Sequence, residues 1–128
     1  EIDLSINSEK IILNSDKEQI SRVFLNLIKN SIESIQQKAE NGSNFNKKIT
    51  IELTESDDHI NLVIVDNGIG FEKITKNIKD ILNPYFTTKK NGTGLGLSIV
   101  NKIINDHNGK IEFIPRNDGA EIKINFVK

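Results

Sequence analysis

Apolar residues recur at helical spacing along two stretches of the chain. Asp16 is a residue type favoured at helix N-caps, and Gln19 lies three residues later, where a capping box has its second member. From there to about Lys38 an apolar stripe recurs every three or four residues, and it consists of Ile20, Phe24, Leu27, Ile28, Ser31 and Ile35. A second stretch begins at about Gly94 and ends near Asn108-Gly109, a typical helix end. The pattern therefore predicts one long and one shorter amphipathic helix.

The remaining apolar runs are short, and several alternate with polar residues, which is typical of strands. Two runs fall within residues 1–15, and four more cover about residues 49–53, 60–65, 111–114 and 121–127. Residues 73–82 show only a weak helical pattern before Pro84. Strand pairs on either side of two main helices predict an α+β fold, a two-layer sandwich in which a mixed sheet is covered on one face by helices.

Composition narrows the classes of function. The 17 basic and 18 acidic residues nearly balance, which argues against nucleic-acid or membrane-surface binding. The chain has no cysteine, which excludes disulfides and thiolate metal sites, and no apolar run approaches the ~20 residues of a bilayer span. We expect the chain to be a cytoplasmic domain. The longer protein to which it would belong can be anchored in the inner membrane or not.

We find no internal repeat and no domain boundary, so residues 1–128 are expected to form one domain. The chain begins at Glu1 and contains no methionine, from which we expect it to be a fragment of a longer protein.

Three glycines at alternate positions, Gly92, Gly94 and Gly96, lead directly into the second helix. Backbone N–H groups are unpaired at a helix start, and glycine lets a phosphate approach them closely. Lys89 and Lys90 add positive charge just upstream. The spacing matches neither the P-loop nor the dinucleotide-binding fingerprint, and protein-kinase motifs such as His-Arg-Asp are absent. The stretch therefore predicts a nucleotide-phosphate site of another kind.

Asn26, Asn30 and Glu33 are spaced four and three residues apart on the first helix, so they share one flank of it. Such residues often form only a solvated face. Asparagine is a poor helix former, however, and its amide oxygen can ligate Mg²⁺, a hard cation that prefers oxygen. Asn30 is the better placed of the two asparagines, near the middle of the apolar stretch.

The segment Asp66-Asn67-Gly68-Ile69-Gly70 ends the most apolar strand. By itself it is typical of a simple turn. A carboxylate at this point can also accept a hydrogen bond from the amino group of adenine, and it would repel the keto oxygen of guanine. Gly68 and Gly70 would then allow flat contact with the base.

The segment Pro84-Tyr85-Phe86-Thr87-Thr88-Lys89 precedes the glycines. Its two aromatic residues can anchor a mobile lid. The hydroxyls of Thr87 and Thr88 and the cation of Lys89 can contact phosphate oxygens. An ordinary surface loop with two aromatics tucked under it explains the same residues equally well.

Taken together, four segments resemble the N, first-glycine, F and second-glycine boxes of sensor histidine kinases. They are residues 25–33, 66–70, 84–89 and 92–97, which read LNLIKNSIE, DNGIG, PYFTTK and GTGLGL. They occur in this order with fitting gaps, and the resemblance spans nearly the whole chain. The PYFTTK version and the short lid are most similar to the nitrogen-regulation (NtrY/NtrB-like) class. Leu82 stands where the family often has the first phenylalanine of the F box.

The resemblance implies a Bergerat ATP-binding fold with ATP and Mg²⁺ as ligands. Asn30 matches the Mg²⁺ ligand of the family, and Asp66 matches the carboxylate that reads adenine. The glycines match the flexible lid and its phosphate contacts. The ATP-binding set implied by these matches is Asn26, Asn30, Glu33, Asp66, Gly68, Gly70, Tyr85, Thr87, Thr88, Lys89, Gly92, Thr93, Gly94, Leu95 and Gly96.

Asn26 stands where the hydrolysing relatives (gyrase, Hsp90 and MutL types) and serine-directed kinases have a general-base glutamate. An amide cannot act as a general base, so this difference favours the histidine-kinase branch. No catalytic residue is assigned within the chain, because neither histidine has the surroundings of a phosphoacceptor. His59 is expected in a polar loop, and His107 matches a structural family position near a helix end.

The resemblance thus implies a catalytic domain that donates the γ-phosphoryl group of ATP to a histidine on a separate dimerisation domain of the same protein, from which a response regulator receives it. A stand-alone ATPase and a degenerate nucleotide-sensing scaffold are the alternatives. We expect this fragment to be monomeric, the full-length protein to be a homodimer, and nucleic acid not to be a partner.

Overall fold

The computed structural model describes residues 1–6, 16–42, 44–70 and 96–127. Their elements, in chain order, are β1 (Ile2–Ile6), α1 (Lys17–Glu40), β2 (Ile49–Glu55), β3 (His59–Asp66), α2 (Gly96–Asp106), β4 (Gly109–Arg116) and β5 (Gly119–Val127).

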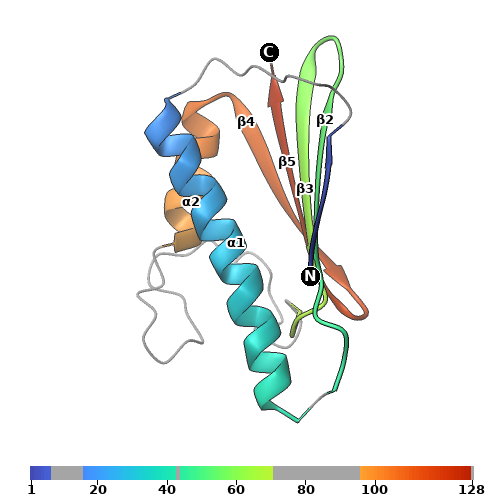
Figure 1. Cartoon of the computed structure of the whole chain (residues 1–128). Helices are drawn as coiled ribbons and strands as arrows, with labels where there is room; N and C mark the ends of the chain where they lie inside the picture. Colours follow the sequence, from blue (N-terminus) through green and yellow to red (C-terminus); the bar gives the residue numbers. More distant parts are fainter. Residues whose placement is uncertain (7–15, 43, 71–95, 128) are drawn as a thin grey trace.

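The strands of this part of the chain form a five-stranded sheet in the order β1-β2-β3-β5-β4. β1 pairs with β2 in parallel, and the other neighbours pair antiparallel, so the sheet is mixed. α1 and α2 lie side by side over the same face of the sheet (Figure 1). The predicted fold class, an α+β sandwich of two layers, is confirmed.

α1 begins where the sequence predicts, and Asp16 is its N-cap. The Asp16 carboxylate accepts hydrogen bonds from the backbone amides of Glu18 (3.0 Å) and Gln19 (3.2 Å). In a full capping box the Gln19 side chain would bind the Asp16 amide. Among the described residues that amide instead donates to Nε2 of His107, at 3.1 Å, so only half of the predicted box is present.

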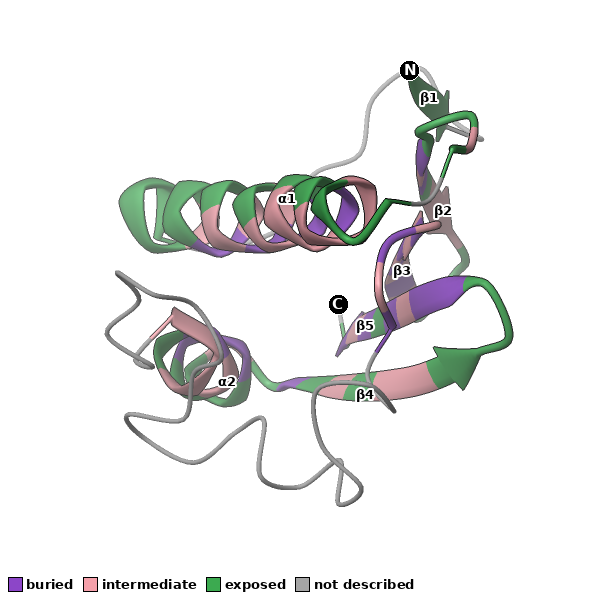
Figure 2. Ribbon diagram, turned by 90° about the horizontal axis from the view of Figure 1, so that it is seen from below, coloured by how far each residue is buried: buried purple, intermediate pink, exposed green. Residues whose placement is uncertain are grey.

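The hydrophobic core lies between the two helices and the sheet. Alternate residues of β3 and β5 are buried, so each strand turns one face to the core. In Figure 2 the purple, buried parts of the helices and strands face one another. The largest fully buried side chains are Val23, Leu27, Leu62, Ile64, Val100, Ile104 and Ile124. Because each such side chain contributes about 1.5–3 kcal/mol, this interior is what holds α1 and α2 on the sheet.

The last two strands form a hairpin around the turn at Asn117-Asp118, with Arg116 paired to Gly119. Both strands extend beyond their apolar runs. α2 ends at Asp106, close to the end predicted near Asn108-Gly109, and Asn108 takes the left-handed conformation (φ 58°) common after a helix C-terminus.

His59 is the first residue of β3, so its prediction as part of a polar loop is wrong. It pairs with Val127, and its carbonyl accepts a hydrogen bond from the amide of Ser56 at 2.9 Å. Backbone pairing thus reaches one residue further than the apolar run that signalled the strand.

Neither α1 nor α2, the helices of the described residues, combines the length and the hydropathy that a membrane-spanning helix needs. The second strand predicted within residues 1–15 and the weak helical segment at 73–82 lie outside the described residues.

Candidate functional site

Asp66 is a buried carboxylate at the end of β3. Its side chain is only 6% exposed, and its Oδ1 accepts a hydrogen bond from the amide of Gly68 at 2.9 Å. The hydroxyl of Ser31, on the facing side of α1, donates a second hydrogen bond to it. Asp66 and Ser31 are the buried polar side chains of the described chain, and each helps to satisfy the other.

Burial raises the pKa of the Asp66 carboxyl above its ordinary value of 3.8. The hydrogen bonds from Gly68 and Ser31 and the positive charge of Lys38 act in the opposite direction, because each favours the ionised form. The Asp66 carboxyl is therefore a hydrogen-bond acceptor held in a fixed position at the edge of the core. Such a group can select a ligand by its donor pattern.

The turn after Asp66 is held tightly against α1. A Cβ on Gly68 would meet the Ser34 hydroxyl and would lie 2.7 Å from the Ser34 carbonyl carbon and 2.8 Å from the amide nitrogen of Ile35. The amide of Ile69 donates to the Ser34 hydroxyl at 3.0 Å. Glycine at position 68 is therefore required for the close approach of the turn to α1. The predicted flat contact with a base would be a second reason for glycine there.

Asn67 joins the same turn to the loop that follows α1. Its side chain accepts a hydrogen bond from the amide of Lys48 at 2.9 Å and donates one to the carbonyl of Asn46. Its own carbonyl accepts a hydrogen bond from the Lys38 ammonium group at 3.0 Å. The same ammonium group lies 4.5 Å from the centre of the Phe45 ring. Asn67 thereby fixes the backbone beside Asp66.

β5 supports Asp66 from the other side. A Cβ on Gly119 would clash with the carbonyl oxygen of Asp66 and would lie 2.8 Å from the Cα of Asn67. Gly70 has a positive φ of 82°, and a Cβ there would lie 3.0 Å from the carbonyl oxygen of Gly119. These close backbone contacts explain glycine at both positions.

Asn26, Asn30 and Glu33 lie along one flank of α1, as their spacing predicted, and all three are partly buried. The Asn26 side-chain amide donates a hydrogen bond to the carbonyl of Arg22 at 3.0 Å. Glu33 lies 4.0 Å from the Lys29 ammonium group. A Cβ on Gly96 would be 3.4 Å from the Asn26 oxygen, so the first residue of α2 lies against this flank.

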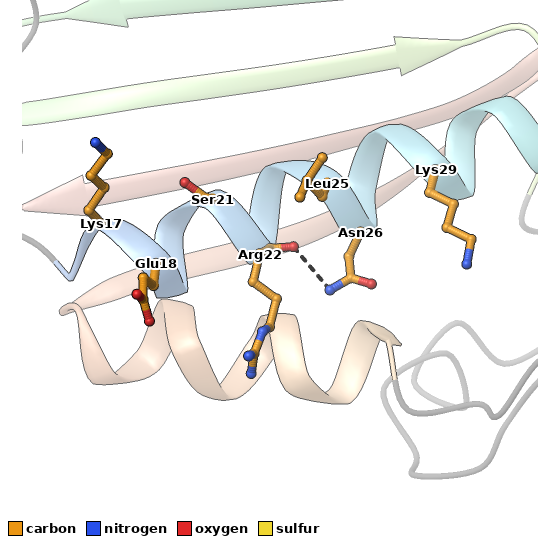
Figure 3. A pocket seen from close by; sticks show the side chains of 7 residues that line it. All are labelled: Lys17, Glu18, Ser21, Arg22, Leu25, Asn26 and Lys29. Atoms are coloured by element: carbon orange, nitrogen blue, oxygen red, sulfur yellow. Dashed lines mark hydrogen bonds between the residues drawn. The ribbon is translucent and has the colours of Figure 1, made fainter.

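An open pocket of about 600 Å³ lies along the N-terminal half of α1. Figure 3 shows its side chains, and the dashed line marks the hydrogen bond from the Asn26 side-chain amide to the backbone carbonyl of Arg22. It is lined by Lys17, Glu18, Ser21, Arg22, Leu25, Asn26 and Lys29. Three of these residues are cationic and one is acidic, so the pocket favours an anionic group. It shares Asn26 with the predicted site and does not include Asp66.

The described residues contain no cluster of three or more His, Cys, Asp or Glu side chains that could hold a metal ion. A divalent cation at this site would therefore need oxygen atoms from another source. The predicted ligand Asn30 carries an amide oxygen, which is a ligand type suited to Mg²⁺, an ion that also binds nucleotide phosphates and waters.

The structure thus brings two groups of predicted residues together at α1: Asp66, Gly68 and Gly70 at one end, and Asn26 and Gly96 at the other. Asn30 and Glu33 lie between these ends on α1. The other predicted site residues lie outside the described residues, and they are Tyr85, Thr87, Thr88, Lys89, Gly92, Thr93, Gly94 and Leu95.

Sequence reasoning did not assign four residues that shape the site: Ser31, Ser34, Lys38 and Asn67. Ser31 carried a usable signal, because a polar residue inside an apolar helical stripe requires a partner. Asn67 stands within the DNGIG segment, which predicts a turn but not the contacts of this side chain, and Ser34 and Lys38 gave no signal in the sequence.

Comparisons with known proteins found similar sequences and similar folds. The family model described as "Histidine kinase-, DNA gyrase B-, and HSP90-like ATPase" matches residues 15–127. Sporulation kinase A of Bacillus subtilis is 35% identical over 126 residues, which cover 97% of this chain and 19% of that protein. A putative NtrY-like sensor histidine kinase of Rickettsia typhi is 38% identical over 112 residues, which cover 87% of this chain and 17% of that protein.

Among solved structures, the nucleotide-free catalytic domain of histidine kinase ThkA is similar to this chain, with a TM-score of 0.79 and 31% identity. The match covers 99% of this chain and 80% of that one. The chain spans about a fifth of the length of the curated relatives it matches.

Proposed function

The chain belongs to the histidine kinase-, DNA gyrase B- and HSP90-like ATPase family, and from this membership we propose that it is the ATP- and Mg²⁺-binding catalytic domain of a two-component sensor histidine kinase. In this proposal it donates the γ-phosphoryl group of ATP to a histidine on a separate dimerisation domain. A response regulator then receives the group.

The observation that carries the proposal is the buried Asp66 carboxylate facing α1. Its position between Ser31 and Gly68 gives a fixed acceptor for the amino group of adenine. From that end the same helix leads to Asn30 and Asn26, beside the first turn of α2. A nucleotide lying along α1 would have its base at Asp66 and its phosphates near Asn26 and the pocket cations Arg22 and Lys29.

Asn30 would hold Mg²⁺ through its amide oxygen, and the ion would neutralise phosphate charge during transfer. The residues of this chain would bind and orient the nucleotide rather than take part in bond making, because phosphoryl transfer depends mainly on positioning and electrostatics. Asn26, with its amide bonded to Arg22, has no proton-accepting role. This supports transfer to a separate acceptor over direct activation of water.

We also propose the NtrY/NtrB-like class, which the PYFTTK segment supports. The similar proteins include a sporulation kinase as well as NtrY-like kinases, so class membership rests on that segment.

Calorimetric titration with a non-hydrolysable ATP analogue and a GTP analogue, each with and without Mg²⁺, tests the function. We expect binding of the ATP analogue, tighter with Mg²⁺, and little binding of the GTP analogue. Absence of ATP binding at millimolar Mg²⁺ would favour the scaffold alternative. Rapid steady-state hydrolysis of ATP by the chain would favour a stand-alone ATPase.

A further inference from the structure

His107 joins the two helices at the end remote from Gly96. Its Nδ1 lies 2.8 Å from the carbonyl oxygen of Ile103 in α2, and its Nε2 lies 3.1 Å from the backbone nitrogen of Asp16. A carbonyl can only accept a hydrogen bond and an amide N–H can only donate one. The ring therefore carries its hydrogen on Nδ1 and accepts at Nε2. This neutral form of the imidazole ties the last turn of α2 to the N-cap of α1.

The two helices are antiparallel and matched in length between their end contacts. At 1.5 Å per residue, α1 rises about 15 Å from Asp16 to Asn26, and the α2 segment rises about 16.5 Å from Gly96 to His107. One end of the pair is the hydrogen bond from Asp16 to His107. The other end is the close approach of Gly96 to the Asn26 side chain. Because α2 is only 11 residues long, fixing one of its ends also restrains the position of the other end.

Apolar side chains fill the space between these ends. Val23 and Leu27 on α1 and Val100, Ile103 and Ile104 on α2 are all buried in one core. These apolar contacts hold the helices together through close packing, which is not directional at either end of the pair. The hydrogen bond at His107 is directional and favours one register.

We propose that His107 is a positioning residue for the nucleotide site: it sets the register of α2 on α1 and so holds Gly96 against Asn26. The contacts of His107 support its role in placing Gly96 against Asn26, whereas the expected effect of His107 on nucleotide affinity rests on the proposed function. His107 does not contact the nucleotide in this proposal.

Three substitutions separate the two hydrogen bonds of the ring. His107→Ala removes both. His107→Asn keeps a donor for the Ile103 carbonyl and loses the acceptor for Asp16. His107→Gln offers an oxygen near the position of Nε2 and should restore part of the effect. Asn61→Ala is the matched control, since it removes a side-chain hydrogen bond to Asn125 between β3 and β5, away from both helices.

The first measurement is NMR on the nucleotide-free chain. We expect the ring ¹⁵N shifts of the wild type at pH 8 to report hydrogen on Nδ1. The signals of Gly96 and Asn26 should move in His107→Ala and His107→Asn and stay in place in Asn61→Ala. If the Gly96 and Asn26 signals do not move in His107→Ala, or if the wild type carries its hydrogen on Nε2, the proposed positioning of α2 by His107 is refuted.

The second measurement is affinity for an ATP analogue with Mg²⁺, at a temperature where every variant is folded. Loss of one net hydrogen bond corresponds to a fall of about three- to tenfold, which we expect for His107→Ala and His107→Asn. His107→Gln should lie closer to the wild type, and Asn61→Ala should match it. Equal loss in Asn61→Ala would mean general destabilisation and would overturn the positioning role, as would unchanged affinity in His107→Ala. A wild type that binds no ATP contradicts the proposed function. The NMR signals of Gly96 and Asn26 then still test whether His107 positions α2.

Discussion

Replacing Asp66 with asparagine would isolate the contribution of one buried charge. The side chain is 6% exposed, and the substitution changes one oxygen to an amino group of nearly equal size. The remaining oxygen can still accept from the Gly68 amide, while the new amino group can donate to the Ser31 hydroxyl. The fold and the packing should therefore be retained, and the charge alone is lost.

The effect on ATP binding follows from the strength of a hydrogen bond to a charged acceptor. Such a bond contributes about 1.5–3 kcal/mol, or roughly 10- to 150-fold in Kd. We expect Asp66→Asn to lower the affinity for ATP by at least about tenfold. The discrimination against GTP should weaken too, because the amide no longer repels the keto oxygen of guanine by its charge.

The effect on stability should have the opposite sign. Because burial raises the pKa of Asp66, the folded chain binds its proton more tightly than the unfolded chain does. The Asp66 carboxyl therefore makes its full contribution to wild-type stability below the pKa it has in the unfolded chain, near 3.8. This contribution is lost as the pH rises through the higher pKa of the folded chain. At pH 7 the asparagine variant avoids this cost, and we expect it to be more stable by on the order of 1 kcal/mol.

Urea unfolding at pH 7 and at lower pH, together with calorimetric ATP titration, measures both effects. The stability advantage of Asp66→Asn should narrow as the pH falls toward 3.8. Asp118→Asn, at an exposed position in the β4–β5 turn, is the control and should change neither quantity. Wild-type ATP affinity in Asp66→Asn would refute the adenine-reading role. A loss of more than about 2 kcal/mol in stability at pH 7 would refute the account of the buried charge.

Three other substitutions or assays test the rest of the site. Gly68→Ala should destabilise the fold by at least about 2 kcal/mol in urea unfolding, because the added Cβ meets helix backbone at 2.7 Å; an unchanged midpoint would contradict this. Asn30→Ala should leave metal-free ATP binding unchanged and abolish the gain from Mg²⁺. Equal wild-type affinity with and without the metal would remove the basis for that role. The chain incubated with radiolabelled ATP should retain no acid-labile phosphate, since neither of its histidines is assigned as an acceptor; retained label would show that one of them is.

Local patterns in the sequence predicted most of the fold. The Asp16 cap, the apolar stripe and the alternating strands each depend on neighbours within a few residues, so α1 and the strand positions could be found without the structure. The parallel pairing of β1 with β2 could not, because it joins segments separated by the whole of α1. His59 was misplaced for a similar reason, since its strand pairing is with distant Val127.

The candidate site was predicted by motif and only partly by physics. Asp66 and Asn26 were identified, yet the reason for Gly119 lies in its contact with the Asp66 carbonyl, which no local pattern reveals. Lys38 and Asn67 likewise act across the fold, through a hydrogen bond between two elements. Spacing indicates which residues share a helix flank, whereas contacts between elements depend on the tertiary fold.

α1 also fixes the distance between the two ends of the candidate site. Ser31 touches Asp66 at one end of the candidate site, and Asn26 meets Gly96 at the other, with about 7.5 Å of helix rise between them. This distance is set by continuous helical hydrogen bonds, so it cannot adjust to a ligand as a loop can. Inserting one residue between Asn26 and Ser31 would advance one end by about 1.5 Å and rotate it by about 100° relative to the other. If a nucleotide spans both ends as proposed, this fixed separation would set the ligand length that fits the site.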